Sequence, residues 1–215
     1  MIQFLIVNFL FNNCMIKSNV TICAVINRAA SMKEGKDNRS FISFNLTLPL
    51  VGKDGSTRTV DISVSADGDQ TAASLYTAGH RVTVKGELML RKRNDVVYFN
   101  LHADDIKFAA ATDADSIEGD FHFKGKISKD GVKTHTDKKG KSFQSFSAFS
   151  TDRDGDNVEF VWVRFLNFHS SKESFMKANA YVEVKGDLQL GVYKDALSID
   201  CLVREIVPWE LQRHA

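Results

Sequence analysis

Apolar and polar residues alternate with a period of two over most of the chain, the spacing expected of strands that bury one face. This pattern predicts two sets of five strands. The first set covers residues 19–31, 39–50, 57–66, 80–91 and 96–107, and the second covers 117–129, 141–151, 158–167, 180–191 and 196–207. Between the third and fourth strands of each set lies a segment that favours a short helix, residues 70–79 and 170–179. The predicted order is β-β-β-α-β-β, twice.

The chain also repeats itself. "RVTVKGEL" at 81–88 returns as "YVEVKGDL" at 181–188, and at the same offset of 100 Ile106 meets Ile206. Upstream the offset becomes 102, where "NRSFISF" at 38–44 aligns with "GKSFQSF" at 140–146, as a change in loop length would cause. A repeat of this length indicates duplicated domains, because solenoid units are shorter.

The repeat predicts the division of the chain. We expect domains at 18–110 and 117–215, the second with a short C-terminal extension. They are joined by a linker of small and acidic residues at 111–116. Five strands with a helix between the third and fourth are the arrangement of the OB-fold, a partly open all-β barrel. Gly86 and Gly186 lie within each fourth strand, where a missing side chain permits the bulge or sharp coil that closes a small barrel.

The N-terminal residues 1–17, "MIQFLIVNFLFNNCMIK", form an apolar extension. They lack the basic start and small-residue cleavage site of a signal peptide, and they are too short to span a bilayer. The favoured interpretation is that Met15 is the true start and that residues 1–14 are an upstream extension. The alternatives are an added apolar strand or oligomer contact, and a secretion signal.

Composition is that of a globular protein, with 43% hydrophobic residues and two prolines. The net charge of +1 gives no overall positive field, so a case for nucleic acid must rest on local clusters. The three cysteines form no C-x-x-C pair and fit neither a disulfide framework nor a zinc ribbon; they are Cys14, Cys23 and Cys201. We therefore expect a reduced, cytoplasmic protein.

Strand parity separates core rings from surface rings in the second unit. Over 158–167, one face carries Val161, Val163 and Phe165, and the other carries Phe160, Trp162 and Arg164. Over 141–151, Phe146 and Ala148 are expected to point inward and Phe143 and Phe149 outward. In the first unit Phe44, Leu46 and Leu48 are expected inward and Phe41 outward, but the next strand offers Thr59, Asp61 and Ser63 outward. The second barrel is the better-equipped aromatic platform.

Cations gather beside this predicted platform. The run "KGKISKDGVKTHTDKKGK" at 124–141 holds seven lysines against two aspartates. The loops between the fourth and fifth strands add further cations and a tyrosine. Binding of single strands without sequence preference needs rings for stacking and a cationic groove for the backbone. The candidate nucleic-acid-binding residues are Phe143, Phe149, Phe160, Trp162, Arg164, Tyr193, Lys194, Lys126, Lys133, Lys138, Lys139, Lys141, Phe41, Arg91, Lys92 and Arg93.

These residues have a second interpretation. A lysine-rich hairpin is typical of a soluble edge, and outward rings such as Phe160 and Tyr193 can pack against the other domain. Trp209 is more typical of a barrel-end plug or a dimer contact than of a base-binding residue.

Other chemistry finds no support in the sequence. "DRDGDN" at 152–157 lacks the glycine position and final acid of a calcium loop, and "GKS" at 140–142 lacks the earlier glycine of a phosphate loop. The six histidines show no ligand spacing, and no nucleophile has a recognisable base beside it. We expect no enzyme activity, no cofactor, no metal, no small-molecule substrate and no membrane partner.

The sequence resembles bacterial and phage single-stranded DNA-binding proteins. The resemblance rests on "DGDNVEFVWVRFLN" (154–167), "SFMKANAYVEVKGDLQL" (174–190) and "GVYKDALSID" (191–200), and on "DGSTRTVDISVS" (54–65), "LYTAGHRVTVKGELMLRKR" (75–93) and "NDVVYFNL" (94–101). It implies single-stranded DNA as the partner and a homodimer that presents four barrels. Such proteins commonly end in a long acidic, Phe-tipped tail that recruits replication proteins, whereas this sequence ends at "VPWELQRHA".

The sequence-based hypothesis is therefore a cytoplasmic protein that coats single-stranded DNA in replication, recombination or repair, from a phage or mobile element. Two alternatives stay open. The barrels could bind RNA, because stacking and phosphate contacts do not sense the 2′-hydroxyl. They could also form a protein-interaction module whose aromatic face is buried between subunits.

Overall fold

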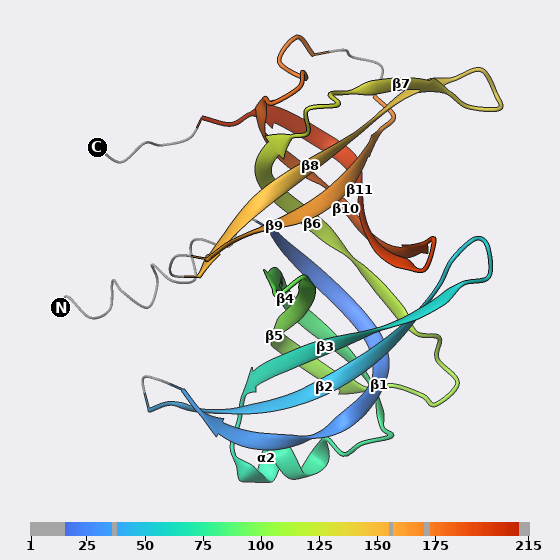
Figure 1. Cartoon of the computed structure of the whole chain (residues 1–215). Coiled ribbons are helices and arrows are strands. Elements are labelled where there is room, and N and C mark those ends of the chain that lie inside the picture. Colours follow the sequence, from blue (N-terminus) through green and yellow to red (C-terminus); the bar gives the residue numbers. More distant parts are fainter. Residues whose placement is uncertain (1–15, 36–37, 155–156, 170–172, 211–215) are drawn as a thin grey trace.

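The structure is a computed structural model that describes residues 16–35, 38–154, 157–169 and 173–210. Two β-barrels lie one above the other, with the N-terminal barrel at the bottom of Figure 1. Residues 1–15, which contain most of the expected apolar extension, lie outside the described residues. Residues 16 and 17, which we expected to belong to that extension, instead begin the first strand.

The first barrel closes in the strand order of an OB-fold. Strand β1 pairs with β2, β2 with β3, β3 in parallel with β5, β5 with β4, and β4 again with β1. The short helix α2 lies between β3 and β4, and the Asp69 carboxylate caps it by accepting a hydrogen bond from the Ala72 N–H at 2.9 Å. The elements are β1 (Ile16–Glu34), β2 (Ser40–Val51), β3 (Thr57–Asp67), α2 (Gln70–Leu75), β4 (Arg81–Arg93) and β5 (Val96–Phe108).

The second barrel repeats this closure. Strand β6 pairs with β8, β8 with β9, β9 in parallel with β11, β11 with β10, and β10 with β6. The added strand β7 pairs with β8 and turns the lysine-rich loop into a hairpin. The elements are β6 (Ser116–Ile127), β7 (Lys133–Thr136), β8 (Ser142–Asp154), β9 (Asn157–Asn167), β10 (Tyr181–Tyr193) and β11 (Ala196–Pro208). The protein is therefore all-β with two tandem OB-fold barrels, as the sequence predicted.

The helix predicted at 170–179 is not found in its described part. Residues 173–180 form consecutive turns, in which the Met176 N–H bonds to the Glu173 carbonyl and the Ala180 N–H to the Lys177 carbonyl. Asn179 takes a positive φ of 63° and donates its N–H to the Ile127 carbonyl. A helix this short is marginal on its own, so these ties to β6 decide the conformation.

The inward positions predicted from parity are correct in both barrels. Every one of the eight side chains is buried, and the rings of Phe146 and Phe165 stack at 4.9 Å between centroids, at the centre of the second core. Burial of such large apolar surfaces is the main stabilisation of a barrel of this size. The eight residues are Phe44, Leu46, Leu48, Phe146, Ala148, Val161, Val163 and Phe165.

The two repeated glycines mark matching bulges. The β4–β5 register shifts between Lys85 and Gly86, and the β10–β11 register shifts between Lys185 and Gly186. A Cβ at Gly86 would lie 1.9 Å from the His102 carbonyl oxygen, and one at Gly186 would lie 2.1 Å from that of Leu202. The bulge therefore brings two backbones closer than any side chain allows, which confirms the role predicted for these glycines.

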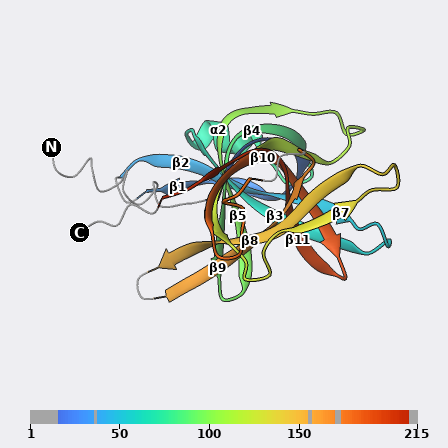
Figure 2. The same cartoon turned by 90° about the horizontal axis from the view of Figure 1, so that it is seen from above.

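The two barrels share one continuous sheet. Residues 16–23 of β1 pair antiparallel with residues 116–123 of β6, so that the described strands form a single 11-stranded sheet. Viewed from above, β8 and β9 run diagonally across the barrels, and β8 extends past their walls (Figure 2). The outer face of β8 and β9 carries the candidate binding surface.

Cys23 and Cys201 are buried and free. Burial, and to a smaller extent the negative charge of Asp187, raises the pKa of the Cys201 thiol to about 12.

Among the described residues, no helix combines the length and the apolar character needed to cross a membrane.

Candidate nucleic-acid interface

The outer face of β8 and β9 carries a cluster of three rings, Phe149, Phe160 and Trp162, here called the Trp162 cluster. Phe149 and Trp162 are direct cross-strand partners with centroids 4.9 Å apart, and Phe160 meets Phe149 edge-on at 5.2 Å. Trp162 is 52% exposed and Phe160 is 44% exposed. The three rings contact one another in edge-on or tilted geometry, and the exposed surface of Trp162 and Phe160 is accessible to a stacking base.

A second group of rings lies farther along the same strands, formed by His135, Phe143 and Phe168 and called the Phe143 cluster. The Phe143 ring stacks on His135 at 5.0 Å and on Phe168 at 5.1 Å, with interplanar angles of 25° and 23°. Neither His135 nor Phe168 was among the candidates. Phe168 lies one residue past the predicted strand 158–167 and continues its even-numbered, outward positions, so strand parity could have identified it from the sequence. His135 reaches the cluster through the unpredicted strand β7.

Arg164 lies between the two clusters, opposite Ser147. Its Nε donates to Asp200 Oδ1 at 3.1 Å, and its Nη2 also donates to that carboxylate. Asp200 is buried and accepts a further hydrogen bond from the Ser198 hydroxyl at 2.7 Å. The Arg164 charge is therefore matched inside the protein, and the residue keeps N–H donors but contributes no net charge to the surface.

The lysines of the β7–β8 hairpin border these rings without carboxylate partners. Lys133 is the cross-strand partner of Ser145 and so shares the outer face with the Phe143 cluster. At the turn, the Asp137 carboxylate accepts hydrogen bonds from the backbone N–H groups of Lys139 and Lys141, both at 2.8 Å. Asp137 thus binds the backbone of these two lysines, and their side chains are exposed. Within the described residues, no ion pair engages Lys133, Lys138, Lys139 or Lys141. Their charges are available to a polyanion.

The structure gives Arg91, Lys92 and Arg93 other partners than those expected. Their hairpin contacts the β8–β9 hairpin, where Asp152 pairs with Arg93 at 2.7 Å and with Arg91 at 3.5 Å. Glu159 lies 3.8 Å from the Lys92 ammonium and accepts the Asn94 N–H at 2.6 Å. Lys92 also pairs with Asp95 of its own hairpin at 2.9 Å. Asp152 and Glu159 therefore meet these cations from the other barrel, because folding brings loops of different domains together.

The matching hairpin of the second barrel lies at another part of the junction. It reaches the β2–β3 hairpin, where Arg58 donates to the Asp195 carbonyl at 3.0 Å (Figure 1). The Tyr193 ring is 61% exposed, with the Lys194 ammonium 5.5 Å from its centroid. These two residues are accessible, but the described contacts do not join them to either ring cluster.

The first barrel has no ring pair at the corresponding position of β2 and β3. The cross-strand pair at the position of Phe149 and Trp162 is Thr47 and Asp61, which are hydrogen-bonded at 3.3 Å. Phe41 is half-buried at the start of β2, opposite Asp67, and is not joined to the candidate residues of the second barrel. The carboxylate of Asp61 would repel a phosphate backbone, so the two barrels differ in the ligand they suit.

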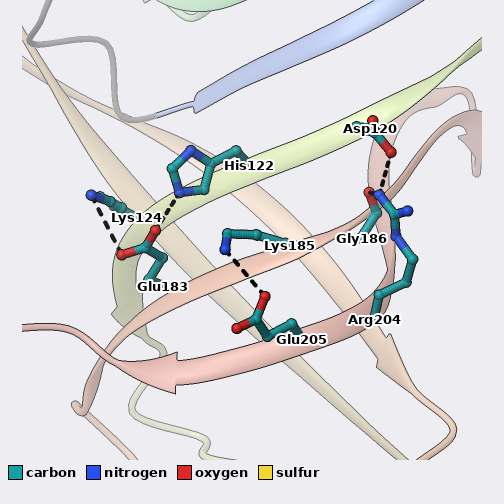
Figure 3. A network of polar contacts seen from close by, with 8 residues as sticks. All are labelled: Asp120, His122, Lys124, Glu183, Lys185, Gly186, Arg204 and Glu205. Atoms are coloured by element: carbon teal, nitrogen blue, oxygen red, sulfur yellow. Dashed lines mark hydrogen bonds and ion pairs between the residues drawn. The ribbon is translucent and has the colours of Figure 1, made fainter.

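A network of ion pairs covers the outer face of β6, β10 and β11 (Figure 3). Glu183 accepts from His122 Nε2 at 2.6 Å and lies 3.4 Å from Lys124, so the charge of that lysine is paired within the protein. Partial burial opposes ionisation of Glu183, but the His122 hydrogen bond and the Lys124 charge outweigh it and lower its pKa. Other pairs join Lys185 to Glu205 at 3.1 Å and Arg204 to Asp120.

A metal site is not found among the described residues, because no three His, Cys, Asp or Glu side chains converge there.

Comparisons with known proteins concern the fold. No protein-family model and no curated protein matches the sequence. Among solved structures, the chain is similar to the wild-type single-stranded DNA binding protein from Thermus aquaticus, with a TM-score of 0.47 and 13% identity over 92% of this chain and 95% of that one. A deletion mutant of that protein gives 0.46 and 14% over 90% and 94%. The small single-stranded DNA-binding protein from Streptomyces coelicolor gives 0.33 and 20%, over 45% and 97%.

Proposed function

We propose that this protein binds single-stranded DNA, without strong sequence preference, on the outer face of its second barrel. The observation that carries the proposal is the pair of solvent-exposed ring clusters on β8 and β9, bordered by lysines that have no carboxylate partner among the described residues. A buried aromatic face would indicate a structural role. An exposed face with unmatched cations has the two properties that single-strand binding requires.

The proposed mechanism is passive. Bases stack on the Trp162 cluster and on the Phe143 cluster, while phosphates lie along Lys133 and the lysines of the β7–β8 turn. Arg164 donates its remaining N–H groups between the clusters but adds no net charge, because Asp200 matches it. Since every base has a π-face, this arrangement is tolerant of sequence. Tyr193 and Lys194 extend the proposed surface only if the strand reaches the domain junction.

A salt titration tests the proposal. With five lysines, namely Lys126, Lys133, Lys138, Lys139 and Lys141, the logarithm of the affinity for a labelled thirty-nucleotide dT strand should fall against the logarithm of salt concentration with a slope of roughly −3 to −4. Trp162→Ala should weaken binding by about 5- to 150-fold, as the loss of one stacked base implies. Equal affinity for duplex and single strand, or an affinity that salt does not change, would contradict the proposal.

Two further measurements separate the alternative functions. Competition with an RNA strand of the same sequence decides between DNA and RNA, since RNA that displaces the DNA at equal concentration would make RNA an equally good ligand. Quenching of Trp162 fluorescence that depends on protein concentration, in the absence of any oligonucleotide, would favour a protein-interaction surface. The same proposal includes a homodimer, a role in replication, recombination or repair, and a cytoplasmic location. A measurement of the mass in solution tests the homodimer.

A further inference from the structure

Five outward side chains form one row across the second barrel, here called the ring row. Trp162 of β9 is the cross-strand partner of Phe149 of β8, and Phe149 is the partner of Lys126 of β6. Lys126 is in turn the partner of Tyr181 of β10. Trp209, which follows β11, donates its N–H to the Tyr181 carbonyl at 3.1 Å. Cross-strand partners share a face, so the row runs without interruption from the Trp162 cluster to the far end of the barrel.

The chemistry alternates along this row. The Lys126 ammonium lies 5.7 Å from the Tyr181 ring centroid, and the Tyr181 ring meets Trp209 edge-on at 5.9 Å. Tyr181 is 40% exposed. Within the described residues, Lys126 has no carboxylate partner, while Glu183, two residues along β10, is bound by His122 and Lys124 (Figure 3). A free cation therefore lies between two pairs of rings.

The first barrel holds the same row with different side chains, and it serves as an internal control. There Asp61 pairs with Thr47, Thr47 with Val25, and Val25 with Arg81. The Ala109 N–H donates to the Arg81 carbonyl at 3.0 Å, as Trp209 does to Tyr181. The backbone is thus the same, yet none of these five residues is aromatic. Closure of the barrel does not need the rings, which argues against a purely structural role for Tyr181 and Trp209.

We propose that Tyr181 and Trp209 form a second stacking subsite for single-stranded DNA, reached across Lys126 from the Trp162 cluster. The inference rests on the proposed function and extends its site. Neighbouring strands are about 4.8 Å apart, so the four steps of the row span roughly 19 Å. A strand that covers only one ring cluster would not reach the far pair, whereas a longer strand would place one phosphate near Lys126 and further bases on Tyr181 and Trp209.

The test is a series of dT strands of increasing length, from about six to about thirty nucleotides, titrated against Tyr181→Ala and Trp209→Ala. Each variant should bind the shortest strands as the wild type does and should lose about 5- to 150-fold in affinity for long strands. Tyr181→Phe and Trp209→Phe should retain most of the affinity. Phe108→Ala removes an exposed ring of the first barrel that lies outside the row, and it should change nothing at any length.

Trp209 fluorescence provides a second reading that does not depend on an alanine variant. In a Trp162→Phe background, Trp209 is the only tryptophan of the chain, and its emission should be quenched by long strands but not by the shortest ones. If long strands bind the wild type but leave Trp209 emission and the alanine variants unchanged, the subsite is overturned and the proposed function stands. If no single strand binds the wild type at any length, the proposed function itself fails.

Discussion

Phe149 and Trp162 face each other across β8 and β9 with ring centroids 4.9 Å apart, at the position where the first barrel places Thr47 opposite Asp61. Two copies of one scaffold thus carry opposite surface chemistry at the same cross-strand pair. One pair is aromatic, with Trp162 exposed and Phe149 half-buried, and the other is a hydroxyl bonded to a carboxylate. The two barrels share this strand pairing and differ in the side chains it carries, which gives each experiment on the second barrel a matched site in the first.

The double substitution Phe149→Thr with Trp162→Asp should abolish most binding and leave the fold intact. It transfers the first-barrel pair to the second, where the backbone is equivalent, and it replaces two stacking rings with an anion. Loss of two stacks at about 1 to 3 kcal/mol each predicts a decrease in affinity of roughly 30-fold or more. Fluorescence anisotropy of a labelled dT strand measures it, and circular dichroism checks the fold. Thr47→Ala is the control and should bind normally.

Gly186→Ala should destabilise the protein, because a Cβ there would lie 2.1 Å from the Leu202 carbonyl oxygen, a backbone atom that cannot move aside. Overpacking of this kind costs about 1 to 3 kcal/mol or more in the free energy of unfolding. Urea denaturation measures the change. Gly191→Ala, on the same strand, is the control, since a Cβ there meets no heavy atom within 4 Å. Equal midpoints for the two variants would contradict the assignment of a close backbone contact.

Asp152→Asn should weaken the junction between the barrels. The Asp152 side chain is only 14% exposed, and its carboxylate binds Arg91, Arg93 and the Lys92 N–H. Hydrogen bonds between charged groups contribute about 1.5 to 3 kcal/mol, so a loss of this order in the free energy of unfolding is expected. Asp95→Asn is the control because its ion pair with Lys92 is exposed and contributes little. Chemical denaturation of both variants measures the free energy of unfolding. An equally large decrease for Asp95→Asn would argue against a role of Asp152 in the junction.

Stability should fall in acid partly through Glu183. Its pKa is lowered in the folded state below the ordinary value of 4.5, so the carboxylate stabilises the fold at higher pH. This stabilisation is lost as the pH decreases through the folded-state pKa and Glu183 takes up a proton. The denaturation midpoint of Glu183→Gln should therefore lie below that of the wild type at pH 7, and the difference should shrink below about pH 4. A difference that stays constant with pH would contradict the assignment.

The sequence by itself determined the local and repeated features. Period-two alternation placed every strand of the OB order within a few residues, and the parity of Val161, Val163 and Phe165 identified the core face, because strand geometry fixes alternate side chains on opposite sides. The offset of 100 between Gly86 and Gly186 located both bulges. The pattern within each strand, and its repetition 100 residues later, are properties of the sequence itself, so these features could be found without the tertiary structure.

Tertiary structure decided which charges remain unmatched and which rings meet. The sequence did not indicate partners for Arg91 and Arg93, but the junction brings Asp152 from the other barrel against them. Arg164 forms an ion pair with Asp200 of its own barrel. The register of β6 between β8 and β10 aligned Lys126 with Phe149 and Tyr181. Each of these contacts joins strands far apart in the chain, and pairing between distant strands is set by the closed barrel as a whole, which the periodicity of a single segment does not contain.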